Sequence, residues 1–242
     1  MFDLLIQNAQ VLDGTGAPAY LADVAVKDGK IAAVGKLSGE AAETVDAAGL
    51  TLAPGFIDVH GHSDFFMPLD PARASKLLQG VTTELCGQCG LGPAPVTEQN
   101  YPVYHKYLSQ QGIPMYPDDQ TFTSFSAYLS RMEQTPAGIN LAYFIPHGTV
   151  RLAVMGFSHD APDEKQLAQM RELVEDAMQA GALGLSTGLA YAPGRFAATD
   201  ELAALTEPVG RYGGVYTSHL RDQGDQLEQS VQEAIDIARR GG

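Results

Sequence analysis

The sequence predicts an α/β fold, the first part of a (β/α)8 barrel preceded by a small N-terminal β-sandwich segment. Three observations predict it. Residues 1–53 contain short apolar runs separated by turn signals, which is typical of β structure. After Pro54, short apolar strands alternate with helical stretches, which indicates βα units around a parallel sheet. The residues able to carry chemistry directly follow the predicted strands, where βα barrels place their active sites.

The N-terminal part, residues 1–53, is expected to be a meander of short strands. Leu4–Val11 is the first apolar run. Val24–Val26 and Ile31–Val34 flank the turn Lys27–Lys30, whose Asp-Gly pair is a strong hairpin signal. Val45–Leu52 is expected to form a further strand.

Residues 54–242 contain five predicted parallel strands. They are Phe56–Val59, Thr82–Leu85, Ile139–Ile145, Ala182–Leu185 and Val215–Ser218. A (β/α)8 barrel needs roughly 250 residues, whereas 189 follow residue 53. We therefore expect about the first five βα units, with the chain truncated before strands 6–8. A complete open sheet of five parallel strands is the alternative.

Two helices are predicted from apolar stripes at helical spacing. Glu164–Ala180 has acidic residues near its start and Gly181 at its expected stop. Gln226–Arg240 has a similar apolar stripe and is followed by two glycines, which are typical of a helix end. Both stripes are expected to face the core. The segment from Gly92 to Phe122 is rich in Pro and Tyr and weakly periodic, so it is predicted to be a loop insertion, for which a lid is a candidate role.

The composition narrows the range of partners. A net charge of −14, from 15 Lys and Arg against 29 Asp and Glu, argues against nucleic acid and against anionic membrane surfaces. No apolar run reaches the length of a membrane span, and MFDLLIQNAQ lacks the features of a secretory signal, so we expect a cytoplasmic protein. An anionic small substrate would need a local cation, for which Arg195 and Arg221 are candidates.

PGFIDVHGHSD places two histidines at the end of the first predicted barrel strand. The period of two in a strand sends His60 and His62 to the same side, with Gly61 between them. Two neutral imidazoles facing one way provide half of a metal site. The alternative is a pair of ordinary polar residues at a strand end.

Cys86 and Cys89, in CGQCG, admit three interpretations. Half a zinc ribbon needs a second cysteine pair, which the sequence lacks. A redox pair normally opens a helix, which the following Gly-Leu-Gly-Pro cannot readily start. The third interpretation makes Cys89 a thiolate ligand and Cys86 a small buried residue.

Three further polar residues lie near predicted strand ends. His219 follows the fifth strand and is either a ligand or a strand-end histidine capped by a carbonyl group. His147 is interpreted mainly as a supporting residue, and Asp64 as a carboxylate that orients an imidazole ligand or as a loop cap.

Several motifs together resemble a known family. PGFIDVHGHSD after a small β segment resembles the amidohydrolase superfamily of metal-dependent barrel hydrolases. The stretches GVTTELCGQCG, PHGTVRLAVMG, GALGLSTGLAYAPGRFAATDEL and GGVYTSHLRDQGD are similar to the N-acyl-D-amino-acid deacylase (D-aminoacylase) family within it. The match runs from about residue 3 to the last residue, with the motifs in the same order.

The resemblance implies a set of site residues. Cys89 matches a zinc ligand that replaces the bridging carboxylated lysine of many relatives, and His219 matches a second ligand of the same tightly held zinc. His60 and His62 match the pair that lines a second, weaker metal position. Tyr191 matches a tyrosine that polarises the scissile carbonyl. The family's sixth-strand histidine and its general-base aspartate fall beyond Gly242, so the visible fragment alone is expected to be inactive.

The implied function is hydrolysis of N-acyl-D-amino acids, small molecules that would be cleaved with the help of zinc into a carboxylate and a D-amino acid. A cyclic-amide hydrolase of the hydantoinase or dihydroorotase kind and a non-catalytic relative remain alternatives. A redox or zinc-storage protein built on both cysteines is a third. The sequence leaves the oligomeric state and the acyl and side-chain preferences open.

Overall fold

The computed structural model describes residues 1–66, 72, 74–114 and 121–242 of the chain. These residues fold as two compact units, Met1–Phe56 and Ile57–Gly242. The division lies close to the boundary expected between residues 53 and 54. Each unit has its own sheet structure and is described by itself.

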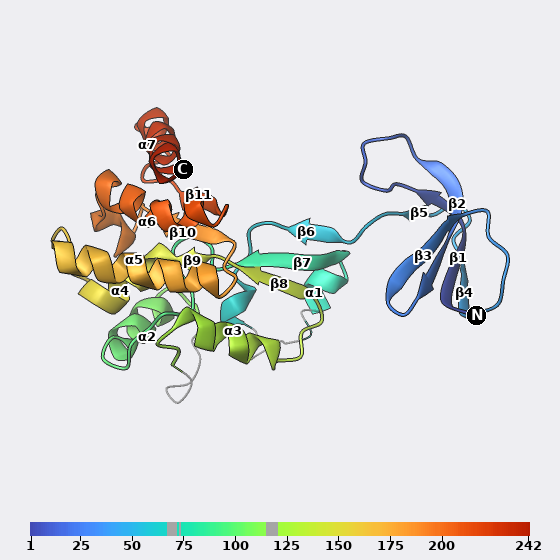
Figure 1. The fold of residues 1–242 in the computed structure, drawn as a ribbon, viewed down its shortest axis with the longest axis horizontal. Coiled ribbons are helices and arrows are strands. Elements are labelled where there is room, and N and C mark those ends of the chain that lie inside the picture. The colour runs from blue at the N-terminus through green and yellow to red at the C-terminus, as the bar shows by residue number, and fades with distance from the viewer. Residues whose placement is uncertain (67–71, 73, 115–120) are drawn as a thin grey trace. The chain divides into compact units, whose positions relative to one another are not determined.

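The N-terminal unit is built around one five-stranded sheet (Figure 1). Its strands are β1 (Phe2–Val11), β2 (Tyr20–Lys27), β3 (Lys30–Gly35), β4 (Ala41–Asp46) and β5 (Thr51–Leu52). The order is β3-β2-β1-β4, and β5 also pairs with β1. The predicted hairpin joins β2 to β3, with Asp28 and Gly29 at the positive φ of 52° and 70° that a tight hairpin turn requires.

The predicted strand Val45–Leu52 is wrong as one element. The chain leaves β4 after Asp46, turns, and returns as β5. Leu50 N donates to Ala47 O at 2.9 Å, and Gly49 has φ 79°, a left-handed conformation that interrupts a strand.

The described strands of the second unit form two three-stranded sheets, and in each sheet they follow one another in sequence order (Figure 1). They are β6 (Phe56–Asp58), β7 (Val81–Cys86), β8 (Asn140–Tyr143), β9 (Ile145–Pro146), β10 (Gly184–Gly188) and β11 (Val215–His219). The pairs β7–β8, β9–β10 and β10–β11 are parallel. All five predicted strands are present, but the third is divided into β8 and β9 at Phe144, which donates from its backbone N to Cys86 O at 2.9 Å.

Helices alternate with these strands. They are α1 (Ala74–Leu77), α2 (Tyr101–Ser109), α3 (Phe125–Glu133), α4 (His147–Met155), α5 (Glu164–Gln179), α6 (Thr199–Arg211) and α7 (Leu227–Gly241). The two predicted helices are confirmed as α5 and α7, each within one residue of its expected ends. Asp163 starts α5 with a capping box in which its side chain and that of Gln166 each accept from the other's backbone.

The predicted loop insertion is wrong over residues 101–109, which form α2. Pro102 lies in the first turn of this helix, where a missing N–H costs nothing. The buried face consists of Tyr101, Tyr104 and Leu108, so aromatic packing supports a helix whose periodicity is weak in the sequence. Residues 115–120, which belong to the predicted lid, lie outside the described residues.

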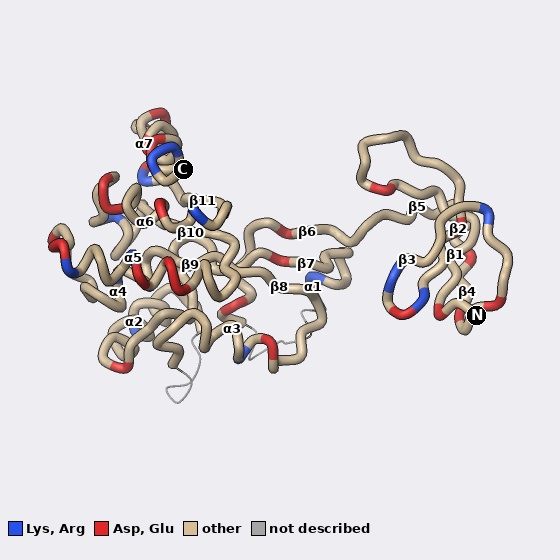
Figure 2. The backbone as a smooth tube through the Cα atoms, viewed as in Figure 1, with Lys and Arg blue, Asp and Glu red and all other residues tan. Residues whose placement is uncertain are grey.

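The main core lies between the second unit's strands and its helices. Met170, Val174 and Ala177 of α5 are fully buried and pack with Leu185 of β10. On the outer surface, ion pairs join α5 to α6. Both helices carry basic and acidic residues, which are coloured blue and red in Figure 2. Such exposed pairs contribute little to stability.

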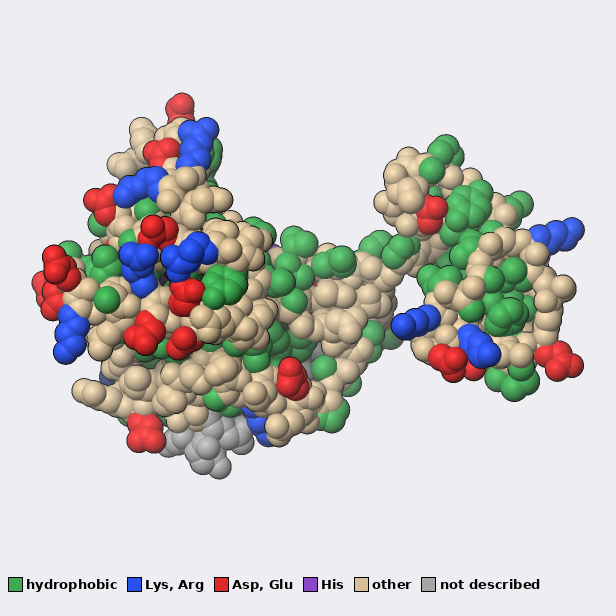
Figure 3. Space-filling view, viewed as in Figure 1, with side chains coloured by type: hydrophobic (Ala, Val, Ile, Leu, Met, Phe, Trp, Pro, Cys, Tyr) green, Lys and Arg blue, Asp and Glu red, His purple; other side chains and the backbone are tan. Residues whose placement is uncertain are grey.

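Some large apolar side chains remain on the surface of each unit (Figure 3). Leu21 and Ile31 are exposed in the N-terminal unit, and Ile57 and Val59 are exposed at β6. Within the described ranges, none of the helices combines the length and the apolar character needed to cross a bilayer.

Candidate metal centre

Three of the predicted site residues converge in the second unit. Donor atoms of His60, His62 and Cys89 all lie within 4.8 Å of one another. His60 Nε2 is 3.1 Å from Cys89 Sγ, and the two imidazole rings have centroids 5.6 Å apart. Nitrogen and sulfur donors at this spacing are the kind that zinc prefers. The cluster forms because β6 and β7 are neighbours and their ends meet at one edge.

Several hydrogen bonds hold the turn that carries the two histidines. His60 N donates to Asp58 Oδ1 at 3.1 Å, and Gly61 N donates to Leu85 O at 3.0 Å. Glu84, fully buried in β7, accepts from Ser63 Oγ at 2.5 Å and from Ser63 N at 3.3 Å. The turn is therefore held from β7, the strand that leads to Cys89.

Gly61 has to be glycine for this turn to form. A Cβ at this position would lie 1.7 Å from Glu84 Oε1, far inside contact distance. The glycine thus lets the backbone between the two histidines press against a buried carboxylate. Lys76 Nζ, 3.7 Å from Glu84 Oε1, supplies a compensating positive charge.

The loop that carries Cys89 follows an unusual backbone path. Gly87, Cys89 and Gly90 have φ of 72°, 57° and 65°, so three residues in a short loop are left-handed. Gly90 N donates to Ser186 Oγ at 3.1 Å. A Cβ on Gly188 would lie 2.3 Å from Cys89 O, so the loop passes directly over bare backbone of β10. Glycines on both sides therefore allow Cys89 to reach the histidines.

The protonation states of these residues suit metal binding. Burial, and then the neighbouring His60 charge, lower the pKa of His62, which favours the neutral imidazole that binds metals. Burial raises the pKa of the Cys89 thiol. A cation at the cluster would favour its thiolate form, because a positive charge stabilises the negative sulfur. The donor set therefore fits a zinc ion.

Cys86 has a different environment from Cys89. Its side chain is fully buried in the main core, and burial raises its thiol pKa strongly. Both cysteines are free thiols, and only Cys89 belongs to the donor cluster found among the described residues. This arrangement separates the roles of the two cysteines.

Tyr191 lies beside the cluster. Its hydroxyl donates to Cys89 O at 2.8 Å, and burial raises its pKa, so it remains a protonated donor near neutral pH. It also lines a cavity of about 190 Å³ next to the donor atoms. The other lining residues are His62, Phe65, Phe66, Cys89, Leu91 and Ile113. A mostly apolar space thus opens onto two of the clustered donors.

His219 lies outside the three-residue cluster. It ends β11, and its ring centroid is 5.3 Å from that of Tyr191, which meets it edge-on. Tyr191 therefore contacts both the cluster and His219. Of the four expected metal ligands, His60, His62 and Cys89 form one cluster of donor atoms in the described structure. His219 lies outside this cluster and packs against the ring of Tyr191.

His147 and Asp64 are buried supporting residues. His147 begins α4, directly after β9, and its Nε2 is 3.1 Å from Glu201 Oε1 of α6. Asp64 Oδ2 accepts from Gly87 N at 3.1 Å. Burial raises the pKa of Asp64 to about 7. Asp64 thus links the histidine turn to the cysteine loop without joining the donor cluster.

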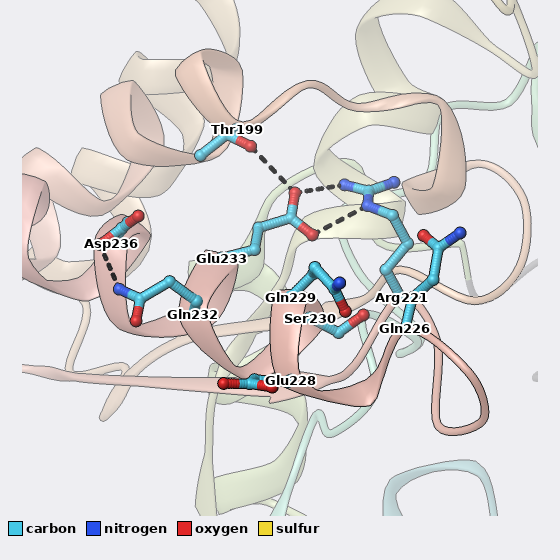
Figure 4. Close-up of a pocket in the computed structure, with 9 residues that line it drawn as sticks. All are labelled: Thr199, Arg221, Gln226, Glu228, Gln229, Ser230, Gln232, Glu233 and Asp236. Carbon is cyan, nitrogen blue, oxygen red and sulfur yellow. Dashed lines mark hydrogen bonds and ion pairs between the residues drawn. The ribbon is translucent and has the colours of Figure 1, made fainter.

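Arg221 is occupied by a structural ion pair. Its guanidinium donates to both carboxylate oxygens of Glu233, at 2.8 and 2.9 Å, beside a polar cavity of about 720 Å³ at α7 (Figure 4). It also donates to the carbonyls of Arg195 and Ala197. Because Glu233 neutralises this guanidinium, the structure gives no support to Arg221 as a contact for an anionic substrate.

Sequence reasoning missed Glu84 and Gln88. In VTTELC, the period of two puts Thr82, Glu84 and Cys86 on one face of β7, so a glutamate in the middle of a short parallel strand was a usable signal. The sequence does not indicate a role for Gln88, because a glutamine between two cysteines is typical of an ordinary loop.

Comparisons with known proteins add independent information. The model of the amidohydrolase family matches residues 43–234. A D-aminoacylase from Alcaligenes xylosoxydans xylosoxydans is 38% identical over 239 residues, which are 98% of this chain and 48% of the relative.

Two solved structures are similar in fold and sequence. A crystal structure of N-acyl-D-glutamate deacylase from Bordetella bronchiseptica, complexed with zinc and a phosphonate inhibitor that mimics the tetrahedral intermediate, has a TM-score of 0.89 and 37% identity over 98% of this chain and 49% of its own. A D-aminoacylase structure concerned with a binuclear metal centre, one-metal activation and second-metal attenuation has a TM-score of 0.90 and 36% identity, covering 99% of this chain and 50% of its own.

The resemblance to N-acyl-D-amino-acid deacylases inferred from the motifs is confirmed by these matches. The chain spans about half the length of the relatives it matches. The family model covers most of the chain, from the end of the N-terminal sheet to α7. The chain therefore belongs to the amidohydrolase family.

Proposed function

We propose that the protein is a zinc-dependent amidohydrolase that removes the N-acyl group from N-acyl-D-amino acids and releases a carboxylate and a D-amino acid. The observation that carries the proposal is the convergence of His60, His62 and Cys89 beside Tyr191 and an apolar cavity. The similarity to a D-aminoacylase and to an N-acyl-D-glutamate deacylase solved with zinc supports the same reaction and metal.

We propose that Cys89 and His219 hold the tightly bound zinc and that His60 and His62 line a second, weaker position. Zinc with such ligands acts as a Lewis acid that polarises a carbonyl and acidifies water at near-neutral pH. His60 Nε2 already lies 3.1 Å from Cys89 Sγ, so the two positions would be neighbours. The neutral His62 imidazole and the Cys89 sulfur both face the cavity in which the acyl group would lie.

Tyr191 is proposed to stabilise the oxygen of the scissile carbonyl. Its hydroxyl is a protonated donor that now bonds to Cys89 O at 2.8 Å, and in the substrate complex it would turn to the substrate carbonyl. A hydrogen-bond donor aimed at an oxygen that gains negative charge typically accelerates acyl transfer. Phe65, Phe66 and Leu91 would exclude water from this side of the reacting bond.

The fold is proposed to be the first part of a closed (β/α)8 barrel, with the N-terminal sheet as part of a small β-sandwich. In each of the two three-stranded sheets, β6-β7-β8 and β9-β10-β11, the strands follow one another in sequence order, as in a barrel. The donor cluster lies after β6 and β7, at the edge where barrel enzymes place their active sites. The cytoplasmic location remains a prediction.

Three alternatives predict different features of the site. A cyclic-amide hydrolase would carry a bridging lysine on the fourth strand, whereas β10 reads GLSTG. A non-catalytic relative would have lost ligands, whereas all the expected positions up to His219 are filled. A protein built on both cysteines would use Cys86, which is buried in the core and does not belong to the donor cluster found among the described residues.

The direct test is hydrolysis by the whole protein of N-acetyl-D-amino acids, their L enantiomers, hydantoin and dihydroorotate. The proposal expects release of the D-amino acid only, loss of activity on chelation, and recovery on addition of Zn²⁺. Hydrolysis of the cyclic amides without the linear D substrates would instead establish the cyclic-amide alternative.

A further inference from the structure

Gln88 is a buried amide side chain with a partner at each end. It is 1% exposed and lies in the loop between β7 and Cys89. Its Nε2 donates to Val59 O at 3.0 Å, and its Oε1 accepts from Thr217 Oγ1 at 3.2 Å. One side chain therefore joins segments that are 29 and 129 residues away in the sequence.

The hydrogen-bond partner at each end of this amide is close in the sequence to a proposed metal ligand. Val59 immediately precedes His60, and Thr217 lies in β11 shortly before His219. Gln88 itself immediately precedes Cys89. Gln88 thus bonds to both of the other ligand-bearing segments. Neither of its two bonds involves a donor atom of the cluster.

The cysteine loop needs such a tie because its own backbone is strained. Cys89 is a non-glycine residue at φ 57°, a left-handed conformation that is unfavourable for residues with a Cβ. A strained loop persists only when its surroundings determine it. The bonds of Gln88 to β11 and to the end of β6 are two such determinants.

A purely packing role does not explain an amide at this position. Burying an amide costs free energy unless both its donor and its acceptor are satisfied. An apolar residue of similar length would fill the same space without that requirement. Glutamine is useful here because it fixes two backbone segments at defined distances.

We propose that Gln88 is a positioning residue that sets the spacing of Cys89, the His60 turn and the His219 strand, and thereby the metal affinity of the site. The proposal rests on the metal site described under the proposed function. Loss of supporting hydrogen bonds around metal ligands typically weakens metal binding by about 10- to 100-fold. We expect a loss in this range when the bonds of Gln88 are removed.

The test is Co²⁺ binding by the purified, metal-depleted whole protein, followed by the thiolate-to-cobalt charge-transfer absorption. Gln88→Met keeps the side-chain length and removes both hydrogen bonds. Thr217→Val removes only the hydrogen bond between Gln88 and β11. It provides a second variant for the same test if Gln88→Met does not fold. Thr206→Val is the structural control, because it removes a buried bond to Ala203 O within α6 and another to Ile237 O of α7.

Gln88→Met is expected to weaken Co²⁺ binding by about 10-fold or more and to alter the charge-transfer band. Thr217→Val should weaken Co²⁺ binding less than Gln88→Met does. The double variant Gln88→Met, Thr217→Val should bind Co²⁺ as well as Gln88→Met alone. Thr206→Val should lower thermal stability and leave the affinity and the spectrum unchanged. Wild-type affinity and spectrum in both Gln88→Met and Thr217→Val would overturn the positioning role. A wild-type protein that binds no Co²⁺ would overturn the metal site itself.

Discussion

Gly61, in the turn between His60 and His62, leaves room for the buried carboxylate of Glu84. We predict that Gly61→Ala lowers the free energy of unfolding by roughly 1–3 kcal/mol, because its Cβ would meet Glu84 Oε1 at 1.7 Å. The displaced turn should also weaken metal binding. Chemical denaturation and metal titration measure the two effects.

Gly224→Ala is the matched control for this change. Its added Cβ would only make an ordinary contact of 3.5 Å with Asp222 Oδ1. A Gly61→Ala protein that is as stable as Gly224→Ala, with unchanged metal affinity, would show that the contact with Glu84 does not shape the turn.

The two cysteines should respond differently to substitution. Cys89→Ala is predicted to abolish zinc retention and deacylation in the whole protein, because it removes the sulfur of the donor cluster. Cys86→Ala should leave most of both, because that side chain packs in the core and lies outside the donor cluster. Elemental analysis of zinc per chain measures the difference. Equal losses from the two substitutions would favour a function that uses both thiols.

Substitution of Tyr191 should lower the rate of the chemical step more than it weakens substrate binding. Tyr191→Phe is predicted to lower kcat by about 10²–10³-fold with little change in KM, since its hydroxyl is proposed to act on the carbonyl in the transition state. Tyr107→Phe is the control, because that hydroxyl bonds to Ala192 O at 2.7 Å in the same region. Equal effects of the two changes would assign Tyr191 a structural role only.

Among the elements, α4 and α6 are joined by a buried charged group. Glu201 of α6 contacts His147 Nε2 at 3.1 Å and Arg151 Nη1 at 2.5 Å. Burial alone would raise the pKa of Glu201, but the hydrogen bonds and charges of His147 and Arg151 outweigh it and lower the pKa below its ordinary value of 4.5. The carboxylate is therefore stabilised in its ionised form.

This lowered pKa gives a pH dependence with a definite sign. The contribution of Glu201 to stability is fully present above pH 4.5 and is lost as the pH falls through the lowered pKa. We predict that Glu201→Gln costs about 3–5 kcal/mol near neutral pH, because it leaves the buried Arg151 guanidinium without the carboxylate that pairs with it. The difference from wild type should shrink below pH 4.5.

Urea unfolding at several pH values checks this prediction. Glu207→Gln is the control on the same helix, since Glu207 pairs with Arg171 at the surface, and such pairs contribute less than about 1 kcal/mol. A loss for Glu201→Gln that is constant or grows toward acid pH would contradict the ionised, paired carboxylate.

Elements with strong periodicity were predictable from the sequence, and others were not. The stripes of α5 and α7 gave their ends within one residue. The aromatic face of α2 gave no helical signal, and its buried tyrosines are explained only by tertiary packing. The division of the third strand at Phe144 was also hidden, since it depends on a backbone bond to Cys86.

At the scale of the whole molecule, the convergence of distant segments was predictable because strand ends meet at one edge of a parallel sheet. That reasoning brought His60, His62 and Cys89 together, and the structure groups their donor atoms. The supporting bonds of Glu84 and Gln88 could not be predicted, because they depend on distances between strands that no local pattern encodes. For the same reason, the position of His219 next to Tyr191 came from the structure alone.

These segments are proposed to hold together a divalent metal that catalysis requires. The decisive measurement is elemental analysis of the purified, active whole protein, combined with an assay on N-acyl-D-amino acids before and after chelation. We expect at least one zinc per chain, loss of activity when the metal is removed, and recovery when Zn²⁺ is returned. Full activity in metal-free protein would show that catalysis does not need a metal.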